Sequence, residues 1–401
     1  MGDTSLKLQS AACQIAYWED GDLRIANYLI RRTFATESAT LDLIRFFFSP
    51  HTIADALLEF RAYSPRSVCR AILRLIDAQL LLECGSVAWK RDRLVESSWK
   101  PWLPEGGLHF MTKDTPYIGA DWSVEKRMKL LPAGRPPAQF KTIPGAVVMR
   151  LSPHELERDA FFETLHARRT HREFARGPVL LEDVSKLLRT TWGVQGYLDA
   201  DLFGRLPYKT SPSGGARHPV EVYLMALRVE GLERGLYHYQ AKDHRLAKLP
   251  GKATARSASA YCAGQTYFGK AAALFIMTAV FARTMWKYGR ARAYRVVLLE
   301  AGHLCQTFCL TATRLGLAPF STAALRDSLI EKDLGLDGIS ESVLYVAGVG
   351  RAISQRQIGI RIGPAGEQQA DDPFRILRGP LVRSRHSPFL RRRARGPDRK
   401  V

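Results

Sequence analysis

The 401-residue chain lacks the features that mark secreted, membrane-spanning and zinc-binding proteins. Its six cysteines are scattered with no Cys-x-x-Cys pair, which argues against a disulfide framework and a zinc site. No apolar run approaches the roughly 20 residues needed to span a bilayer. The first residues also lack a basic stretch followed by an apolar one, so they do not resemble a signal peptide. These absences predict a cytoplasmic protein with reduced thiols, no metal site and no membrane span.

Acidic residues are scarce relative to basic ones, with 39 Asp and Glu against 59 Lys and Arg, a net charge of +20. Such a surplus is typical of proteins that bind nucleic acid or an anionic surface. From residue 375 to the last residue, however, nine arginines and one lysine stand against one aspartate, a surplus of nine. A Pro- and Arg-rich tail of this kind is typical of a solvated, disordered arm, so nucleic-acid binding is the minority interpretation.

The chain is long enough for two or three domains, and 46% of its residues are hydrophobic, as in ordinary globular proteins. Residues 40–86 predict helix, turn, helix and strand, with Ser64 as a cap and Pro65 at the first helical position. This order resembles a winged helix. The following stretch is rich in Trp and Pro, which predicts an irregular connection up to residue 145.

Beyond that connection the pattern is that of an α+β domain. Apolar spacing and turn residues predict three helices and four strand segments. The helices are expected in 157–174, 180–196 and 292–316, and the strands in 220–229, 235–249 (a hairpin), 273–282 and 342–351. We therefore predict an N-terminal part at 1–145, the α+β domain at 146–370 and the basic tail at 371–401.

Two short stretches carry the residues of a binding site. In "HARRTHREF" (166–174), Arg168, Thr170 and Arg172 alternate, so an extended backbone would project them to one side, where they could grip a phosphate. In "SPSGGARHP" (211–219), Ser213 offers a hydroxyl and the glycine pair lets a planar ring or a phosphate approach the backbone. Taken singly, the first is more often a solvated helix end and the second merely a turn.

Together, and in this order, these stretches resemble the nitroreductase-like FMN-dependent oxidoreductases, in particular the SagB-type azoline dehydrogenases of peptide maturation. The likeness covers about residues 155–360 and includes "LLEAGHLCQTFCLTATRLGL" as a central helix and "YVAGVGR" as a terminal strand. The resemblance implies an FMN-binding α+β fold with a central mixed or antiparallel sheet. It also implies a homodimer with the flavin at the subunit interface.

The resemblance assigns roles by position. Residues matching the segment that holds the FMN phosphate and ribityl groups are Arg168, Arg169, Thr170 and Arg172, with Arg351 as a further phosphate partner. Residues matching the stretch along the flavin ring are Pro212, Ser213, Gly214 and Gly215. His218 and Glu221 are expected to be architectural, with His218 satisfying backbone groups near the glycine turn.

The SagB-type enzymes carry a Lys-Tyr pair before the central helix, and Lys287-Tyr288 match it. Oxidising an azoline to an azole requires loss of a ring proton and transfer of a hydride to flavin N5, so a base is needed. Burial and the neighbouring Arg290 and Arg292 would favour a neutral Lys287 that accepts this proton, with Tyr288 sharing it. Without the resemblance, a surface lysine and a packing tyrosine would be the default interpretation.

Three functions remain open at this stage. The first is dehydrogenation of azoline rings in a ribosomal peptide, with a cyclodehydratase as a possible partner. The second is a general NAD(P)H-dependent nitro or quinone reductase. The third is a DNA-binding regulator with a flavin-sensing domain, because Arg66, Arg70 and Arg74 recur on one helix face. We favour the first, with the winged helix-like part as a structural or leader-peptide docking module that uses strand addition near residues 78–90.

Overall fold

The computed structural model describes residues 6–115, 140–141, 143–147, 149, 151, 159–200 and 204–353. The described residues up to Ile353 belong to one compact unit. The predicted boundary near residue 145 falls in a stretch of which few residues are described. The tail from residue 371 lies outside the described residues, so the three-part division stays a prediction.

Residues 6–86 contain two small sheets and three helices. The first sheet has the order β5-β1-β6 and the second the order β2-β3-β4, all antiparallel. The strands are β1 Lys7–Ser10, β2 Gln14–Glu19, β3 Asp22–Asn27, β4 Arg32–Thr36, β5 His51–Thr52 and β6 Leu81–Glu83, and the helices are α1 Ser38–Phe46, α2 Ile53–Glu59 and α3 Pro65–Asp77. The strands before residue 37 are not predicted from the sequence.

The chain order α1, β5, α2, α3, β6 contains the helices and the final strand predicted for residues 40–86, with β5 as an additional short strand. That this part is a winged helix stays a prediction. Ser64 Oγ accepts a hydrogen bond from Ser67 N at 3.2 Å, and Pro65 occupies the first turn, as predicted. The middle strand of the sheet is β1, which comes from the N-terminus rather than from a hairpin after β6. Arg66, Arg70 and Arg74 are exposed.

The predicted irregular region after residue 86 is wrong in its first part, because α4 (Val87–Trp99) is a regular helix. Ser86 Oγ accepts a hydrogen bond from Trp89 N at 3.1 Å and caps this helix. The first proline of the region, Pro101, comes only after α4 has ended, so it does not interrupt the helix. Three short helices follow: η1 Lys100–Trp102, η2 Glu105–Gly107 and α5 Leu108–Met111.

The main sheet has six strands in the order β13-β12-β10-β14-β16-β15, and every neighbouring pair is antiparallel. Its strands are β10 Val220–Ala226, β12 Gly235–Gln240, β13 Arg245–Leu249, β14 Ala273–Val280, β15 Leu317–Thr322 and β16 Glu341–Arg351. Two small ladders join β7 Val179–Leu180 to β11 Val229–Glu230 and β8 Gly196–Asp199 to β9 Arg205–Tyr208. The predicted strands and the 235–249 hairpin are present, whereas β15 is not predicted from the sequence.

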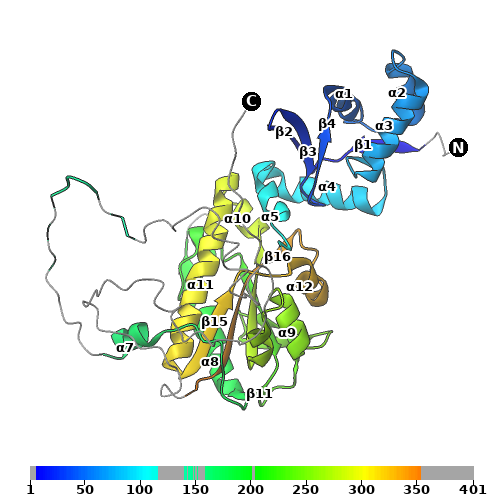
Figure 1. Ribbon diagram of the computed structural model, residues 1–401. Helices are drawn as coiled ribbons and strands as arrows, with labels where there is room; N and C mark the ends of the chain where they lie inside the picture. Colours follow the sequence, from blue (N-terminus) through cyan, green and yellow to red (C-terminus); the bar gives the residue numbers. More distant parts are fainter. Residues whose placement is uncertain are drawn as a thin grey trace, which may run out of the picture. The chain divides into compact units, whose positions relative to one another are not determined.

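Helices cover both faces of this sheet (Figure 1). Helices α8 Leu181–Thr191 and α11 Tyr294–Arg314 cover one face, and α9 Ala255–Tyr261 and α12 Asp327–Leu334 cover the other. The same part of the chain also contains α7 Ala160–Ala167, α10 Ala282–Met285 and the short η5 Thr266–Lys270 and η6 Ala291–Ala293. Side chains of β14 alternate between the two faces, Phe275 and Met277 toward α8 and α11, and Leu274 and Ile276 toward α9 and α12. This explains why the β14 sequence is apolar at successive positions.

The predicted central helix is α11, whose buried side chains belong largely to the core beneath the sheet. Among the described residues, the helical stretch Ala291–Arg314 is the one segment long and apolar enough to cross a membrane, judged by length and composition. Its buried face packs against β10, β14 and β16, which is sufficient reason for its apolar character.

Candidate active site

A glycine turn lies against the predicted catalytic pair. Gly215, in η4 (Gly214–Ala216), has a φ of +62°, in the left-handed region that favours glycine. A Cβ built on Gly215 would lie 2.6 Å from Tyr288 Oη and 2.8 Å from Lys287 Cδ. The side chains of Lys287 and Tyr288 therefore occupy the space that a side chain at position 215 would need. The structure brings together two motifs that are about seventy residues apart in the sequence.

The neighbouring Gly214 has the same kind of close contact. A Cβ on Gly214 would collide with the side chain of Val296 on α11. The sequence predicts that this glycine pair gives a flavin ring access to the backbone. In the structure, the Cβ direction of each glycine faces the protein's own side chains, so both residues are required first for packing within the chain.

Ser213 anchors the turn to α11. Its Oγ donates a short hydrogen bond to Glu300 and accepts one from His218 N at 2.9 Å. Ser211 Oγ and Thr307 Oγ1 are hydrogen bonded at 2.8 Å, so residues 211–214 run along one side of the helix. The Ser213 hydroxyl, predicted to contact the cofactor, is engaged within the protein.

Glu300 is a carboxylate inside an apolar helix, and 3% of its surface is exposed. Burial raises the pKa of Glu300 to about 7, while the hydrogen bond from Ser213 and the charge of Lys209 oppose that rise. At neutral pH this carboxyl group can therefore hold or release a proton directly beneath the glycine turn.

His218 has the architectural role that the sequence predicts. Its Nε2 lies 3.1 Å from the carbonyl oxygen of Pro207, in the strand before the turn. Burial lowers the pKa of His218 to about 4, and the charge of Lys209 lowers it further. The neutral ring can donate from Nε2 to that carbonyl. Burial also lowers the pKa of Lys209, whose charge is near Glu300.

Glu221 is likewise part of the support. It accepts hydrogen bonds from Arg283 Nη1 at 2.6 Å and from His238 Nε2 at 3.0 Å. Arg283 Nη1 also donates to the carbonyl oxygen of His218 at 2.9 Å. These bonds connect the end of the turn to the main sheet through β10 and β12.

Arg217 lies beside the predicted catalytic pair. Its Nε donates to the carbonyl oxygen of Gly215 at 3.0 Å, and its guanidinium carbon lies 5.1 Å from the centre of the Trp286 ring. Its Nη2 is buried and has no hydrogen-bond partner among the described residues. A buried donor without a partner costs about 1–3 kcal/mol.

The segment with the predicted phosphate-binding residues joins the main sheet beside Arg351, at the end of β16. We call these residues the arginine cluster: Arg168, Arg169, Arg172 and Arg351. Ala175 forms a backbone bridge with Arg351 and donates its N–H to the Arg351 carbonyl at 3.0 Å. A Cβ on Gly177 would lie 3.1 Å from Arg351 Nη1. His171 N donates to the carbonyl of Pro319 on β15 at 3.0 Å, which fixes the 168–172 segment nearby.

The individual side chains of that segment differ in their contacts. The Arg172 guanidinium lies 5.9 Å from the Tyr267 ring centre, Thr170 is exposed, and Arg169 Nη1 donates to the His166 carbonyl at 2.6 Å. In the described part of the chain, no salt bridge joins Arg168, Arg172 or Arg351 to a carboxylate. The cluster therefore retains its positive charge for an anion.

The two predicted cofactor segments both lie near α11. The charge of Arg168 acts on Cys309 of this helix, and Ser211 contacts Thr307.

The sequence-based predictions do not include Glu300 and Lys209. Glu300 is detectable, because one acidic residue in the apolar run "VVLLEAGHL" is unusual in a buried helix. Lys209 carries no such signal. Among the described residues, no group of three or more His, Cys, Asp and Glu side chains is placed to hold a metal.

Residues 165–351 match the model of the Nitroreductase family. The chain is 31% identical over 205 residues to MJ1384 of Methanocaldococcus jannaschii, a protein classed as a nitroreductase, covering 51% of this chain and 98% of that protein. The chain belongs to the nitroreductase family.

Two peptide-processing proteins are also similar. The trifolitoxin-processing protein TfxB of Rhizobium leguminosarum bv. trifolii is 37% identical over 143 residues, which is 34% of this chain and 38% of TfxB. The microcin B17-processing protein McbC of Escherichia coli is 32% identical over 150 residues, which is 35% of this chain and 53% of McbC. The matched regions thus cover about a third to a half of these two relatives.

Proposed function

We propose that this protein is an FMN-dependent dehydrogenase that oxidises azoline-type rings during maturation of a ribosomal peptide. The observation that carries the proposal is the packing of Lys287 and Tyr288 against Gly215. Similarity to two proteins named for processing trifolitoxin and microcin B17 supports the substrate class.

The arginine cluster fits the phosphate of FMN, because guanidinium groups without carboxylate partners are the donors that phosphate prefers. The groups that would hold the phosphate and ribityl chain are those of Arg168, Arg169, Thr170, Arg172 and Arg351. Residues 212–215 would lie along the ring. When bound, FMN supplies the oxidant, which takes a hydride from the substrate.

The chain's own residues handle the proton. Loss of two hydrogens from an azoline ring releases one hydride and one proton, and Lys287 in its neutral form accepts the proton at Nζ. Tyr288 Oη, beside the same glycine, shares or relays that proton. The Lys287 Nζ lies 5.8 Å from the centre of the Tyr288 ring, so the two side chains face one site.

The working form in this proposal is a homodimer. Large apolar side chains are exposed on α7 and α11: Phe161 by 61%, Leu298 by 44% and Leu299 by 61%. A second copy covering these faces would also unite the glycine turn of one chain with the arginine cluster of the other. The peptide, a cyclodehydratase that forms its azoline rings, and a cytoplasmic location complete the proposal.

A peptide bearing a thiazoline tests the proposal directly. FMN-loaded protein should convert the thiazoline to a thiazole, seen by mass spectrometry as loss of two hydrogens. Lys287→Met should lower this rate by about 100-fold or more, as expected for removal of a general base. Lys252→Met, at an exposed lysine, is the control and should keep the wild-type rate. An unchanged rate in Lys287→Met would contradict the assigned role.

A general nitro or quinone reductase is the second candidate, favoured by the match to 98% of MJ1384. Reduction of a nitro compound by NAD(P)H needs no base that removes a substrate proton. A Lys287→Met protein that reduces nitro compounds at the wild-type rate, combined with a wild-type protein inactive on azoline peptides, would establish this alternative.

A further inference from the structure

Residues 99–114 lie outside the region that matches the nitroreductase model, residues 165–351, yet pack against the candidate active site. The residues that lead into α11 are 286–293, which we call the catalytic turn because it contains Lys287 and Tyr288. A shared core links the two segments: Trp99, Trp102 and Phe110 pack with Phe281, Met285, Ala293 and Val297, and Tyr288 borders this cluster.

Trp102 bonds directly to the backbone of the catalytic turn. Its side chain is fully buried, and its Nε1 donates to the carbonyl oxygen of Tyr288 at 2.9 Å. The indole also meets the Phe281 and Tyr294 rings edge-on, each at 6.3 Å between centres. These rings lie before and after the turn, so Trp102 contacts the turn at its middle and at both flanks.

His109 holds the far end of the same turn. Its Nδ1 lies 3.1 Å from Tyr294 Oη, at the first residue of α11, and its Nε2 lies 3.0 Å from Ser342 Oγ. Burial lowers the pKa of His109 to about 3, and the charge of Lys113 adds to this effect. The ring is therefore neutral at physiological pH and keeps one donor and one acceptor.

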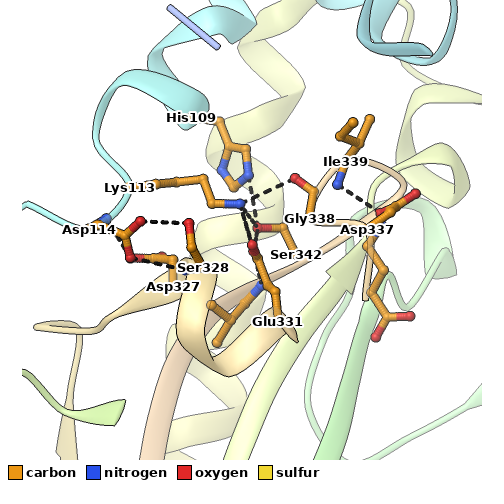
Figure 2. Close-up of polar contacts among 12 residues, drawn as sticks. His109, Lys113, Asp114, Asp327, Ser328, Glu331, Asp337, Gly338, Ile339 and Ser342 are labelled. Atoms are coloured by element: carbon orange, nitrogen blue, oxygen red, sulfur yellow. Dashed lines mark hydrogen bonds and ion pairs between the residues drawn. The ribbon is translucent and has the colours of Figure 1, made fainter. Parts of the chain in front are cut away.

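Polar bonds, those of Lys113 buried, fix the end of this segment at residues 109–114 to the main sheet and to α12 (Figure 2). Lys113 Nζ contacts Glu331 Oε2 at 2.6 Å, with both side chains almost fully buried. Ser342 also donates to Glu331 Oε1, and Asp114 accepts hydrogen bonds from Ser328. A segment held by buried charges cannot shift without exposing or unpairing them, so it offers Trp102 a rigid base.

We infer that Trp102 is a positioning residue that sets the backbone of the catalytic turn and thereby places Lys287 and Tyr288 against Gly215. This inference deepens the proposed function and rests on it. Tyr288 is constrained from two sides, by Trp102 at its carbonyl and by Gly215 at its hydroxyl. Without the bond from Trp102, the backbone at Tyr288 can move. Its hydroxyl and the Lys287 side chain would then move away from their close packing against Gly215.

The test compares two buried tryptophans. Trp102→Phe keeps an aromatic ring and removes the donor to Tyr288, whereas Trp99→Phe removes the donor to the Ile339 carbonyl in the same core. Should Trp102→Phe fold poorly, benzothienylalanine at position 102 keeps the shape of the indole and lacks the N–H. Each FMN-loaded, full-length protein is assayed for kcat and KM on a thiazoline peptide.

A second readout needs no substrate. The acetylation rate of Lys287 by an N-hydroxysuccinimide ester is followed by peptide mass spectrometry, with the exposed Lys252 as internal reference. The change at Trp102 should lower kcat about tenfold with little change in KM, as a small misplacement of a reacting group does. It should also change the Lys287 acetylation rate, whereas Trp99→Phe should leave both quantities near wild type.

Equal kcat and equal Lys287 acetylation in the two variants would overturn the positioning role. A wild-type protein that does not oxidise the peptide, while Lys287 acetylation responds only to the change at Trp102, would overturn the proposed function and keep the positioning role. The two failures are therefore distinguishable.

Discussion

Ser213 in the glycine turn donates a hydrogen bond to the buried carboxyl group of Glu300 in the middle of α11. This bond joins the loop that carries Gly215 to α11, whose inner face lies in the main core. Burial raises the pKa of Glu300 to about 7, so the carboxyl group that holds the turn can gain or lose a proton near neutral pH.

That raised pKa predicts a specific pH dependence of stability. Between about pH 4.5, the ordinary value, and pH 7 the folded state binds the Glu300 proton and the unfolded state releases it. The free energy of unfolding should thus fall as pH rises through this window, by an amount of order 3 kcal/mol. Denaturant unfolding of wild type and Glu300→Gln at both ends of the window should show a smaller fall in the variant.

The matched control for this change is Glu230→Gln, at an exposed position at the end of β11. It should reproduce the wild-type pH dependence. If Glu300→Gln has the same pH dependence as wild type, the carboxyl group is not the source.

A methyl group at position 215 should disrupt the active site more than the fold. Gly215→Ala places a Cβ within 2.8 Å of Lys287 and Tyr288. It also forces alanine to adopt the φ of +62° at this position, which strains the backbone. Gly335→Ala, at φ +75° with nothing within 4 Å, carries backbone strain of the same kind without the clash. Each should lose about 1–2 kcal/mol from the strain, and only Gly215→Ala should lose peptide dehydrogenation. Equal activity in the two variants would contradict the packing described here.

The buried ion pair Lys113–Glu331 should contribute far more to the free energy of unfolding than an exposed ion pair with the same N–O distance. Lys113→Met leaves the Glu331 carboxylate buried without its partner and should cost about 3–5 kcal/mol. The exposed pair Lys186–Glu182 has the same 2.6 Å length. Lys186→Met should leave the denaturant midpoint unchanged within error, because solvent screens an exposed pair. Similar losses in both variants would show that burial is not the deciding factor.

Removal of a guanidinium from the arginine cluster should weaken FMN binding through the phosphate alone. Arg351→Ala should lower FMN affinity by about tenfold or more, the value of a charge-assisted hydrogen bond. Riboflavin, which lacks the phosphate, should bind wild type and variant equally in a fluorescence titration. Arg74→Ala, on the exposed face of α3, is the control. Equal losses for both flavins would place Arg351 away from the phosphate.

Mixing of two impaired variants tests whether two chains build one site. Arg351→Ala damages the predicted phosphate-binding residues, and Lys287→Met damages the predicted catalytic pair beside the glycine turn. Refolding the two variants together should restore dehydrogenation, because a mixed dimer contains one intact site. No recovery, with dimers demonstrated by light scattering, would mean that each chain builds its own site.

The sequence alone determined the strongly patterned elements and the family. The period of apolar residues in α3, α8 and α11 and the doubly apolar run of β14 reflect local geometry and burial, which a single chain records directly. The Arg-rich and Pro-Ser-Gly-Gly stretches indicated the family because the residues of each motif are adjacent in the sequence.

Only the tertiary structure decided what those residues contact. Ser213 and Gly215 are engaged with Glu300, Lys287 and Tyr288 rather than simply open to a ligand. Trp102 meets Tyr288 across 186 residues of chain, and α4 forms where composition suggested a connection. Contacts of this kind depend on how segments far apart in the chain pack together. Such packing produces no repeating pattern of residues that could be recognised in the sequence.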